Sequence, residues 1–423
     1  MTLAQGWDGT SWKVQSTPNA ADGTFSNDLS AVSCSGPDRC TAVGDWSGDG
    51  RGGVLIERWN GVAWMTQAAT VPGGTTAQLT GVSCPSSESC VAIGDDSSSS
   101  YAIVWEGAGW TEQSTPSLGG GQSSNLRAIS CGGSTGCTAV GERVFGTGLV
   151  QPLAERSGGS QWAVQAAVGL PGAQATAITA TSCVQATACQ AVGNFVDASN
   201  GQTLALAEGW SGSGWTIEAM PDPATATSTY ITGVSCPSLN ACLAVGYSTE
   251  RNFDTIAIAE LWDGEHWTIS SVPPPSSATY ATFSAIACDG TNSCTAVGDD
   301  NVAANATFAE HWNGSTWTPQ STASPPGPNA KLDGISCPTI STCTAVGSYE
   351  NASTFQLQPL AEAWDGHRLA DPEHPDTSRR NVRQLPHVGL VQLSAISCTA
   401  PTACTAVGSG SRVVTIPIAE HYS

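Results

Sequence analysis

The sequence is poor in charged residues and contains no long apolar run. Asp, Glu, Lys and Arg together make up 12% of its 423 residues, about half the share of an average globular protein. Lysine is the scarcest charged type, with only Lys13 and Lys331. No apolar stretch approaches the roughly eighteen residues that a membrane-spanning helix needs. We therefore expect no membrane insertion.

Basic charge is also scarce relative to acidic charge. The formal net charge is −21 and the isoelectric point is near 4.4. A field of this sign repels phosphate groups, which argues against binding to nucleic acid or to an anionic membrane surface. The abundance of Ala, Gly, Thr and Pro beside so little Lys is typical of high-GC bacterial genomes.

Cysteine, in contrast, is plentiful and regularly placed. The sixteen cysteines form eight pairs with five residues between partners: Cys34/Cys40, Cys84/Cys90, Cys131/Cys137, Cys183/Cys189, Cys236/Cys242, Cys288/Cys294, Cys337/Cys343 and Cys398/Cys404. Across a hairpin this spacing brings two α-carbons within disulfide range, whereas a zinc site needs four ligands together. The pattern predicts eight local disulfides and no metal.

Disulfides in such number indicate an oxidising compartment. No signal peptide precedes Trp7. We therefore expect a secreted or cell-surface protein whose export signal lies upstream of Met1, in a segment missing from this chain.

Each cysteine pair belongs to a longer repeated unit of about fifty residues. The unit reads roughly Leu-x-x-Val-Ser-Cys, five residues, Cys-Thr-Ala-Val-Gly, as at Leu29 to Gly44. A variable stretch follows, then Glu-x-Trp, an Asn/Asp-Gly turn and a second Trp, as at Glu310 to Trp317. These segments predict four short antiparallel strands per unit, which is the composition of a propeller blade.

The two ends of the chain complement each other. Residues 1–18 carry a third and a fourth strand, while the last unit stops at Ala419 to Tyr422 without its fourth strand. Pairing the ends would leave no open sheet edge. We predict an all-β fold with a single domain over 1–423, an eight-bladed β-propeller with units at roughly 19–67, 68–113, 114–165, 166–218, 219–270, 271–320, 321–392 and 393–423 plus 1–18.

The aromatic, the Asn/Asp-Gly turn and the second Trp resemble kelch-type and other Trp-rich propeller families. The Cys-x5-Cys hairpin resembles repeats in secreted proteins of high-GC bacteria. The resemblance covers nearly the whole chain and implies the propeller fold. The kelch double glycine is absent, and Asp8 directly precedes Gly9 where the sialidase Asp-box has a wider spacing, so no activity is carried over.

One segment, 367–392, departs from every other unit. It holds three of the six histidines, His367, His374 and His387, together with several arginines. Back-translated and shifted by one base, its start regains the expected Trp and Ser-Thr-Pro of the repeat. Our hypothesis is a frameshift, so we do not interpret these residues as a catalytic or metal cluster.

The repeated Trp pairs and glutamates could bind a ligand or take part in catalysis. Because they recur in nearly every unit, a structural role is the favoured interpretation. The pairs such as Trp312/Trp317 are expected to pack between blades. Glutamates recur two residues before the slot of the first aromatic, at Glu57, Glu155, Glu208, Glu260, Glu310, Glu362 and Glu420. Each is expected to accept hydrogen bonds from neighbouring backbone or hydroxyl groups rather than to act as an acid or base.

A calcium site is a weaker alternative at Asp45–Gly50, where oxygen ligands alternate before a glycine. Its closing acid, Glu57, falls one position too far along, so a polar turn is the favoured interpretation and no cofactor is expected. Trp46 lies outside the repeated aromatic slots, which makes it a candidate ligand contact.

Propeller topology places the second-to-third turns and the linkers between units on one face. These are the segments that vary here, so we place ligand binding on this variable face. The candidate residues are Asp45, Trp46, Asp49 and Arg51, then Asp95 and Asp96, Glu142 and Arg143, Tyr247 and Arg251, Asp299 and Asp300, and Tyr349.

Two functions stay open at this point. The first is a noncatalytic, monomeric binding or scaffold module outside the cell that recognises a glycan or a protein. The alternative is a secreted glycoside hydrolase or polysaccharide lyase that uses carboxylates on the same face. Acids that converge with perturbed pKa values would favour the enzyme.

Overall fold

The computed structural model describes residues 1–19, 26–71, 76–96, 98–113, 115–116, 123–134, 136–158, 161–165, 170, 172–302, 306–322, 325, 327–339, 341–364, 369–370 and 391–410. Most of the aberrant segment, along with Glu420 and the other residues after Gly410, lies outside these ranges. The frameshift hypothesis therefore stays a prediction.

The described chain is built from strands, with no α-helix among its assigned elements. The first strands of the repeats are β3 (Ser26–Gly36), β7 (Gln78–Ser86), β11 (Ser123–Cys131), β15 (Ala173–Gln185), β19 (Ala226–Ser238), β23 (Ala281–Gly290), β27 (Lys331–Thr339) and β31 (Val391–Ala400). The second strands are β4 (Arg39–Gly48), β8 (Ser89–Asp95), β12 (Cys137–Val144), β16 (Ala188–Asp197), β20 (Ala241–Glu250), β24 (Ser293–Asp300), β28 (Thr342–Glu350) and β32 (Ala403–Gly410).

The third strands end at the first aromatic of each repeat, except for β13, which ends at Ser157. They are β5 (Arg51–Trp59), β9 (Ser100–Trp105), β13 (Val150–Ser157), β17 (Thr203–Trp210), β21 (Thr255–Trp262), β25 (Ala306–Trp312), β29 (Leu357–Trp364) and β1 (Thr2–Trp7). The fourth strands are β6 (Trp64–Thr66), β10 (Trp110–Gln113), β14 (Trp162–Gln165), β18 (Trp215–Glu218), β22 (Trp267–Ser270), β26 (Trp317–Pro319), β30 (Leu369–Ala370) and β2 (Trp12–Gln15).

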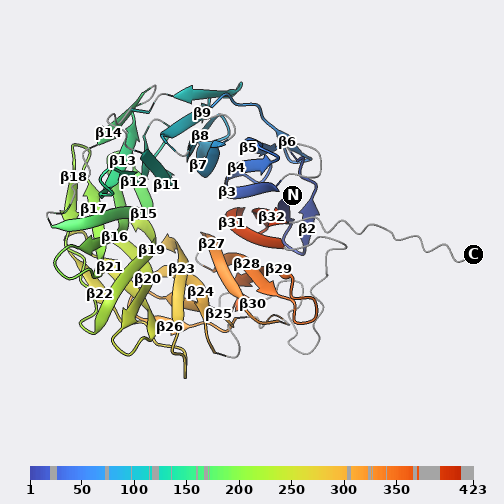
Figure 1. Ribbon diagram of the computed structural model, residues 1–423. Coiled ribbons are helices and arrows are strands. Elements are labelled where there is room, and N and C mark those ends of the chain that lie inside the picture. Colours follow the sequence, from blue (N-terminus) through green and yellow to red (C-terminus); the bar gives the residue numbers. More distant parts are fainter. Residues whose placement is uncertain are drawn as a thin grey trace, which may run out of the picture.

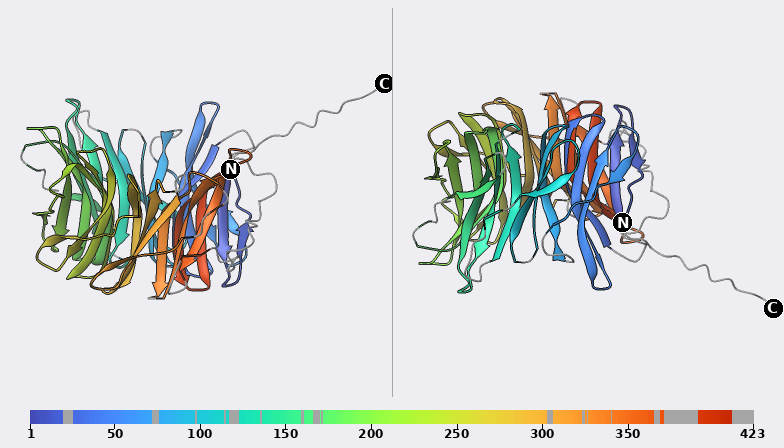
Figure 2. Two further views of the ribbon diagram at one scale, coloured as in Figure 1. Left: turned by 90° about the horizontal axis from the view of Figure 1, so that it is seen from below. Right: turned by 90° about the horizontal axis from the view of Figure 1, so that it is seen from above.

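These strands pair into six four-stranded sheets and one eight-stranded sheet. The larger sheet consists of two antiparallel units, β11–β14 and β15–β18, which a single parallel bridge between Val150 and Ala175 joins. Figure 1 shows the sheets arranged around a central axis with their first strands innermost, and Figure 2 shows the same assembly from the side. The all-β propeller architecture with repeated Trp-rich sheets and cysteine pairs is confirmed.

The first and last described strands share one sheet, in the order β2-β1-β32-β31. Strand β1 pairs with β32 from Thr2↔Ser409 to Trp7↔Cys404. The N-terminal strands thus occupy the third and fourth positions beside the two C-terminal strands that the structure describes.

A close approach between first and second strands explains the glycine of each Ala-Val-Gly motif. Opposite Gly44, the first strand carries a bulge between Leu29 and Ala31. A β-carbon at Gly44 would collide with the carbonyl oxygen of Asp28. The corresponding glycines of other units, Gly246 and Gly298, face the same contact with the first strand, so the bulge excludes any side chain there.

The hydrophobic core lies between neighbouring sheets. Val43 and Ile56 of one sheet pack with Leu79, Tyr101 and Ile103 of the next. Fully burying an aliphatic side chain of this size contributes about 1.5–3 kcal/mol. Neighbouring sheets cover each other's faces in this way. The core therefore does not depend on the turns at the strand ends, whose sequences can vary.

Candidate functional site

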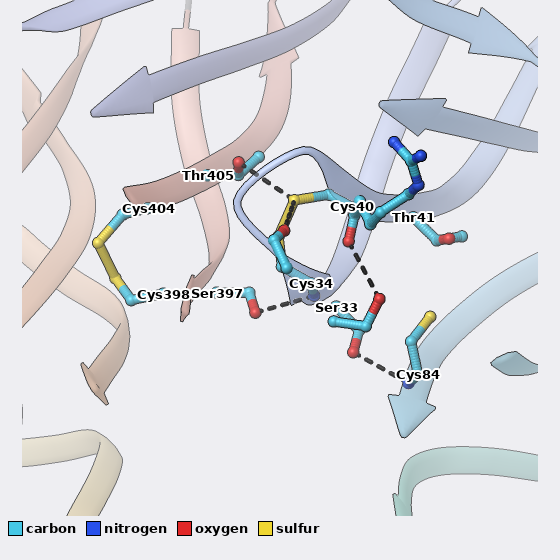
Figure 3. The surroundings of a disulfide bond; sticks show 12 residues. Ser33, Cys34, Cys40, Thr41, Cys84, Ser397, Cys398, Cys404 and Thr405 are labelled. Atoms are coloured by element: carbon cyan, nitrogen blue, oxygen red, sulfur yellow. Dashed lines mark hydrogen bonds between the residues drawn. A yellow bond between two sulfur atoms is a disulfide. The ribbon is translucent and has the colours of Figure 1, made fainter. Parts of the chain in front are cut away.

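The eight predicted disulfides are all present, and no cysteine is free. In six repeats, the serine before the first cysteine accepts a hydrogen bond from the hairpin of the next sheet. The backbone N–H of Cys84 donates to Ser33 Oγ over 3.0 Å, and that of Cys34 donates to Ser397 Oγ over 3.0 Å, as Figure 3 shows. The face of the molecule that carries the cysteine hairpins therefore repeats the same contact from sheet to sheet, and we call it the regular face.

The second cysteine of every pair is buried, whereas among the first cysteines only Cys84 is buried; the sequence pattern did not predict this difference. These buried residues are Cys40, Cys90, Cys137, Cys189, Cys242, Cys294, Cys343 and Cys404. Their sulfur atoms contact the neighbouring sheets, as Cys90 Sγ does with Thr41 Oγ1 over 3.6 Å and Cys189 Sγ with Thr138 Oγ1 over 3.4 Å. They belong to the core, so the disulfides have a structural role.

Strand register separates the regular face from the variable one. In the first repeat, Cys40 pairs with Trp59, so the cysteine hairpin and the Trp turn lie at the same end of the strands. Gly48 pairs with Arg51 at the opposite end. The candidate ligand contacts predicted from the sequence lie toward this second end or in its turns.

The Asp45–Gly50 segment is a tight hairpin. Asp49 and Gly50 have φ of 51° and 71°, as the two central residues of a type I′ turn require. Among the described residues, no group of three or more His, Cys, Asp or Glu side chains could hold a metal ion. Trp46 is half-buried and packs against the core that contains Leu29 and Leu55, while Arg51 is exposed.

Several predicted ligand contacts are engaged within the fold. Asp95 accepts hydrogen bonds from Gln78 Nε2 over 3.0 and 3.1 Å. Glu142 forms an ion pair of 2.6 Å with Arg127, and this hydrogen-bonded carboxylate raises the pKa of Arg127. Such contacts fix these acids in place.

Further predicted contacts lie in turns or close to them. Arg143 donates to Gln151 Oε1 over 2.8 Å. Asp96 accepts backbone N–H bonds from Ser98 and Ser99 in an exposed turn.

Three more predicted residues differ in their exposure. Tyr349 is 1% exposed and packs in the core with Leu332 and Trp364, so its ring offers no surface to a ligand. Asp300 is buried, accepts the backbone N–H of Val302 over 2.8 Å, and has a pKa raised by burial. Arg251 is exposed in the β20–β21 turn.

Tyrosines gather around the predicted contact Tyr247. Its ring stacks on that of Tyr230 with centroids 5.0 Å apart and planes at 24°. Burial raises the pKa of Tyr247, and the nearby Tyr230 and Tyr280 raise it further. Tyr280 is 36% exposed. Three of the six tyrosines in the sequence thus lie together.

Charged and hydroxyl groups adjoin these rings. Thr282 Oγ1 donates to Asp299 Oδ1 over 3.0 Å, and the Tyr280 hydroxyl lies near this carboxylate. Burial raises the pKa of Asp299, whereas the Thr282 bond and the nearby Lys331 lower it. Lys331 pairs with Asp333 over 3.0 Å.

We call Tyr230, Tyr247, Tyr280, Thr282, Asp299 and Lys331 the tyrosine cluster. It offers aromatic faces, hydroxyl groups, a carboxylate and an ammonium group within a small area, a combination suited to stacking and hydrogen bonding with a polar ligand. Sequence reasoning selected Tyr247 and Asp299 but missed Tyr230, Tyr280 and Lys331. The scarcity of Tyr and Lys was the available signal.

Comparison with known proteins supports the fold and leaves the function open. No protein-family model and no curated protein matches the chain. Sqt1 from Chaetomium thermophilum is similar in structure, with a TM-score of 0.52 and 10% identity over 92% of this chain and 97% of that one. At this identity the likeness shows a shared propeller fold and nothing more.

Two other similar structures have lower scores. YCF48 bound to D1 peptide has a TM-score of 0.43 and 13% identity over 78% of this chain and 96% of that one. The GH74 xyloglucanase from Xanthomonas campestris has a TM-score of 0.43 and 11% identity over 94% of this chain and 68% of that one.

Proposed function

We propose that the protein is a noncatalytic, eight-bladed propeller, secreted or displayed on the cell surface, that binds a glycan at the tyrosine cluster. The observation that carries the proposal is the stacked pair Tyr230 and Tyr247, with Tyr280 near both this pair and Asp299. Aromatic rings stack on the apolar faces of sugars, while carboxylate and ammonium groups bond to sugar hydroxyls. A rigid strand scaffold supports these side chains.

The structural parts of the proposal have their own support. The repeated sheets and the pairing of β1 with β32 support eight blades that close into a ring. Eight disulfides are typical of oxidising compartments. Within the described ranges, no helix is long and apolar enough to cross a membrane.

A glycan array tests the proposal. We expect labelled wild-type protein to bind a restricted set of glycans and Tyr247→Ala to lose at least about tenfold in affinity, roughly 1.4 kcal/mol. Phe355→Ala removes an aromatic ring that is 74% exposed in another repeat and is the matched control. An array without any hit, or equal losses in the two variants, would contradict the proposal.

A second candidate, a glycoside hydrolase or polysaccharide lyase, has one observation in its favour. Asp28 and Asp45 are register partners on β3 and β4. Burial raises the pKa of Asp45, and the neighbouring Asp28 raises it further, as in a pair of carboxylates that divide acid and base roles. Release of reducing ends or unsaturated products from polysaccharides, abolished in Asp45→Asn, would favour the enzyme.

A further inference from the structure

In three repeats, the same kind of contact joins the third strand to the next sheet. The residue between the glutamate and the aromatic points at the Trp that ends the following third strand. The Arg58 guanidinium lies 4.0 Å from the centre of the Trp105 ring, and that of Arg156 lies 4.4 Å from the Trp210 ring. His311 stacks on Trp364 with centroids 5.3 Å apart. The chain thus covers several of these Trp rings with its own cationic or aromatic groups.

The two arginines are held by a second contact. Arg58 Nη2 donates to the carbonyl oxygen of Ser87 over 2.9 Å, and Arg156 Nη2 donates to that of Ala186. Ser87 and Ala186 each come three residues after the first cysteine of the next repeat. The face of a Trp ring and the carbonyl oxygen of a hairpin together form a binding site for a guanidinium group.

Two interfaces have a glycine at this position, Gly6 on β1 and Gly209 on β17, and of these only the second has an acid, Glu218, on its fourth strand. On β17, the residue between Glu208 and Trp210 is Gly209. A cavity of about 340 Å³ opens there on the regular face, lined among others by Gly209, Trp262 and Leu239. Leu239 comes three residues after Cys236 and so corresponds to Ser87 and Ala186. The Trp and the hairpin turn are therefore both present.

The same interface also carries a negative charge that the others lack. Glu218 lines the cavity, and the corresponding fourth-strand residue is a neutral glutamine at Gln15, Gln67, Gln113, Gln165 and Gln320. Its carboxylate accepts bonds from Trp267 Nε1 over 2.8 Å and from Gln190 Nε2 over 3.2 Å. Among the described residues it forms no ion pair.

The interface with an acidic fourth-strand residue, Glu218, thus lacks the basic third-strand residue that Arg156 supplies elsewhere. Where Arg156 fills the site, its fourth-strand neighbour is the neutral Gln165; where Gly209 leaves it open, the neighbour is the acidic Glu218. A β-carbon on Gly209 would collide with the Glu218 carboxylate, so this carboxylate lies in the space that the other side chains use. The chain's own repeats therefore specify the chemistry of the occupant.

We propose that the cavity beside Gly209 binds the guanidinium group of an arginine side chain presented by a partner protein, stacked on Trp262 and ion-paired with Glu218. The carbonyl oxygen of Leu239 accepts the remaining hydrogen bond, as those of Ser87 and Ala186 do for the internal arginines. A net charge of −21 speeds the approach of a basic partner. The site lies on the regular face, away from the tyrosine cluster, and is independent of the glycan proposal.

Titration with capped arginine, N-acetyl-arginine methylamide, tests the proposal in the full-length protein. The readout is the indole N–H signal of Trp267 in the nuclear magnetic resonance spectrum, because this group donates to Glu218. We expect a saturable shift with capped arginine and none with capped citrulline, its neutral analogue. Glu218→Gln should weaken binding at least tenfold, while Glu112→Gln, at an exposed glutamate on β10, should leave it unchanged.

A double variant completes the test. Gly209→Arg with Glu218→Gln reproduces the Arg156 and Gln165 pair, so it should fold, raise the melting temperature and abolish binding. The proposal is overturned if capped arginine and capped citrulline give the same shift, if Glu112→Gln weakens binding as much as Glu218→Gln, or if the double variant still binds. Tighter binding of free arginine than of capped arginine would also overturn it, because the site would then serve the amino acid rather than a protein.

Discussion

The backbone N–H of Cys34 donates a hydrogen bond to Ser397 Oγ, although the two residues are 363 positions apart in the sequence. The same bond joins Cys84 to Ser33 and Cys288 to Ser235 in sheets that follow one another directly along the chain. The first and last cysteine repeats thus meet through the contact that links consecutive repeats.

Replacing this serine tests the closing contact in solution. We expect Ser397→Ala to lower the free energy of unfolding by about 1 kcal/mol, because a partly buried N–H loses its acceptor. Ser235→Ala, in the middle of the chain, is the matched control and should cost the same amount in urea titrations. A loss in Ser235→Ala with no loss in Ser397→Ala would show that the ends are apart.

The buried glutamates predict an alkaline loss of stability. Glu57, Glu260 and Glu310 are 0% exposed, and burial raises their pKa values to about 8, 9 and 8. The folded protein therefore holds protons that the unfolded chain releases near its ordinary value of 4.5. Their stabilising contribution is complete below that value and is lost as the pH rises toward 8 or 9.

Melting temperatures between pH 5 and pH 9 measure this effect. We expect a steady decrease, and a smaller decrease in Glu310→Gln, since β1 carries glutamine at the corresponding Gln5. Wild type and Glu310→Gln with identical slopes would contradict the assignment of the titrating group.

The same glutamates differ in their hydrogen bonding. Glu155 accepts a bond from Ser100 over 3.2 Å and Glu362 from Thr307 over 3.0 Å, as the sequence predicted. The carboxyl oxygens of Glu57, Glu260 and Glu310, within the described chain, have no hydrogen-bond partner, so the expectation is wrong for these three glutamates. For Glu310, the residue that corresponds to Thr307 and Ser100 in the preceding repeat is Ala257.

Adding that hydroxyl should stabilise the protein. We expect Ala257→Ser to raise the free energy of unfolding by about 1 kcal/mol, the typical net value of a hydrogen bond. Ser100→Ala is the reverse change and should destabilise by about 1–3 kcal/mol. Urea titrations of both variants check the pair, and a destabilised Ala257→Ser would mean that the site has no room for the hydroxyl.

Arg58 should contribute through its contact with the next sheet. Its guanidinium covers Trp105 and bonds to Ser87, so Arg58→Ala should lower the free energy of unfolding by about 1–2 kcal/mol. Arg39 forms an exposed pair with Asp38, and Arg39→Ala should change stability by less than about 0.5 kcal/mol. Equal effects in the two variants would contradict the role of the ring contact.

The repeat allowed the architecture to be predicted from the sequence, because eight similar units must each build the same sheet. It also indicated the eight disulfides. Contacts between sheets were harder to foresee. Tyr349 looked like a variable-face contact, yet its side chain lies in the core. Whether a strand residue points to the surface or toward the next sheet depends on the bulge and register of each blade.

The Gly209 cavity likewise could not be predicted from the sequence. The sequence displays Arg58, Arg156 and Gly209 at corresponding positions, and Glu218 in place of glutamine. That these residues meet the Trp of the following sheet emerges only from the packing, because the contact joins units about fifty residues apart.

Hydrogen–deuterium exchange with the strongest array glycan tests the location of the binding site most directly. We predict protection at the ends of β19, β20 and β24 nearest Tyr230, Tyr247 and Asp299, and at Tyr280 just before β23, with little change at the cysteine hairpins. Protection confined to the hairpins, or spread over the outer strands, would contradict the assignment of glycan binding to the tyrosine cluster.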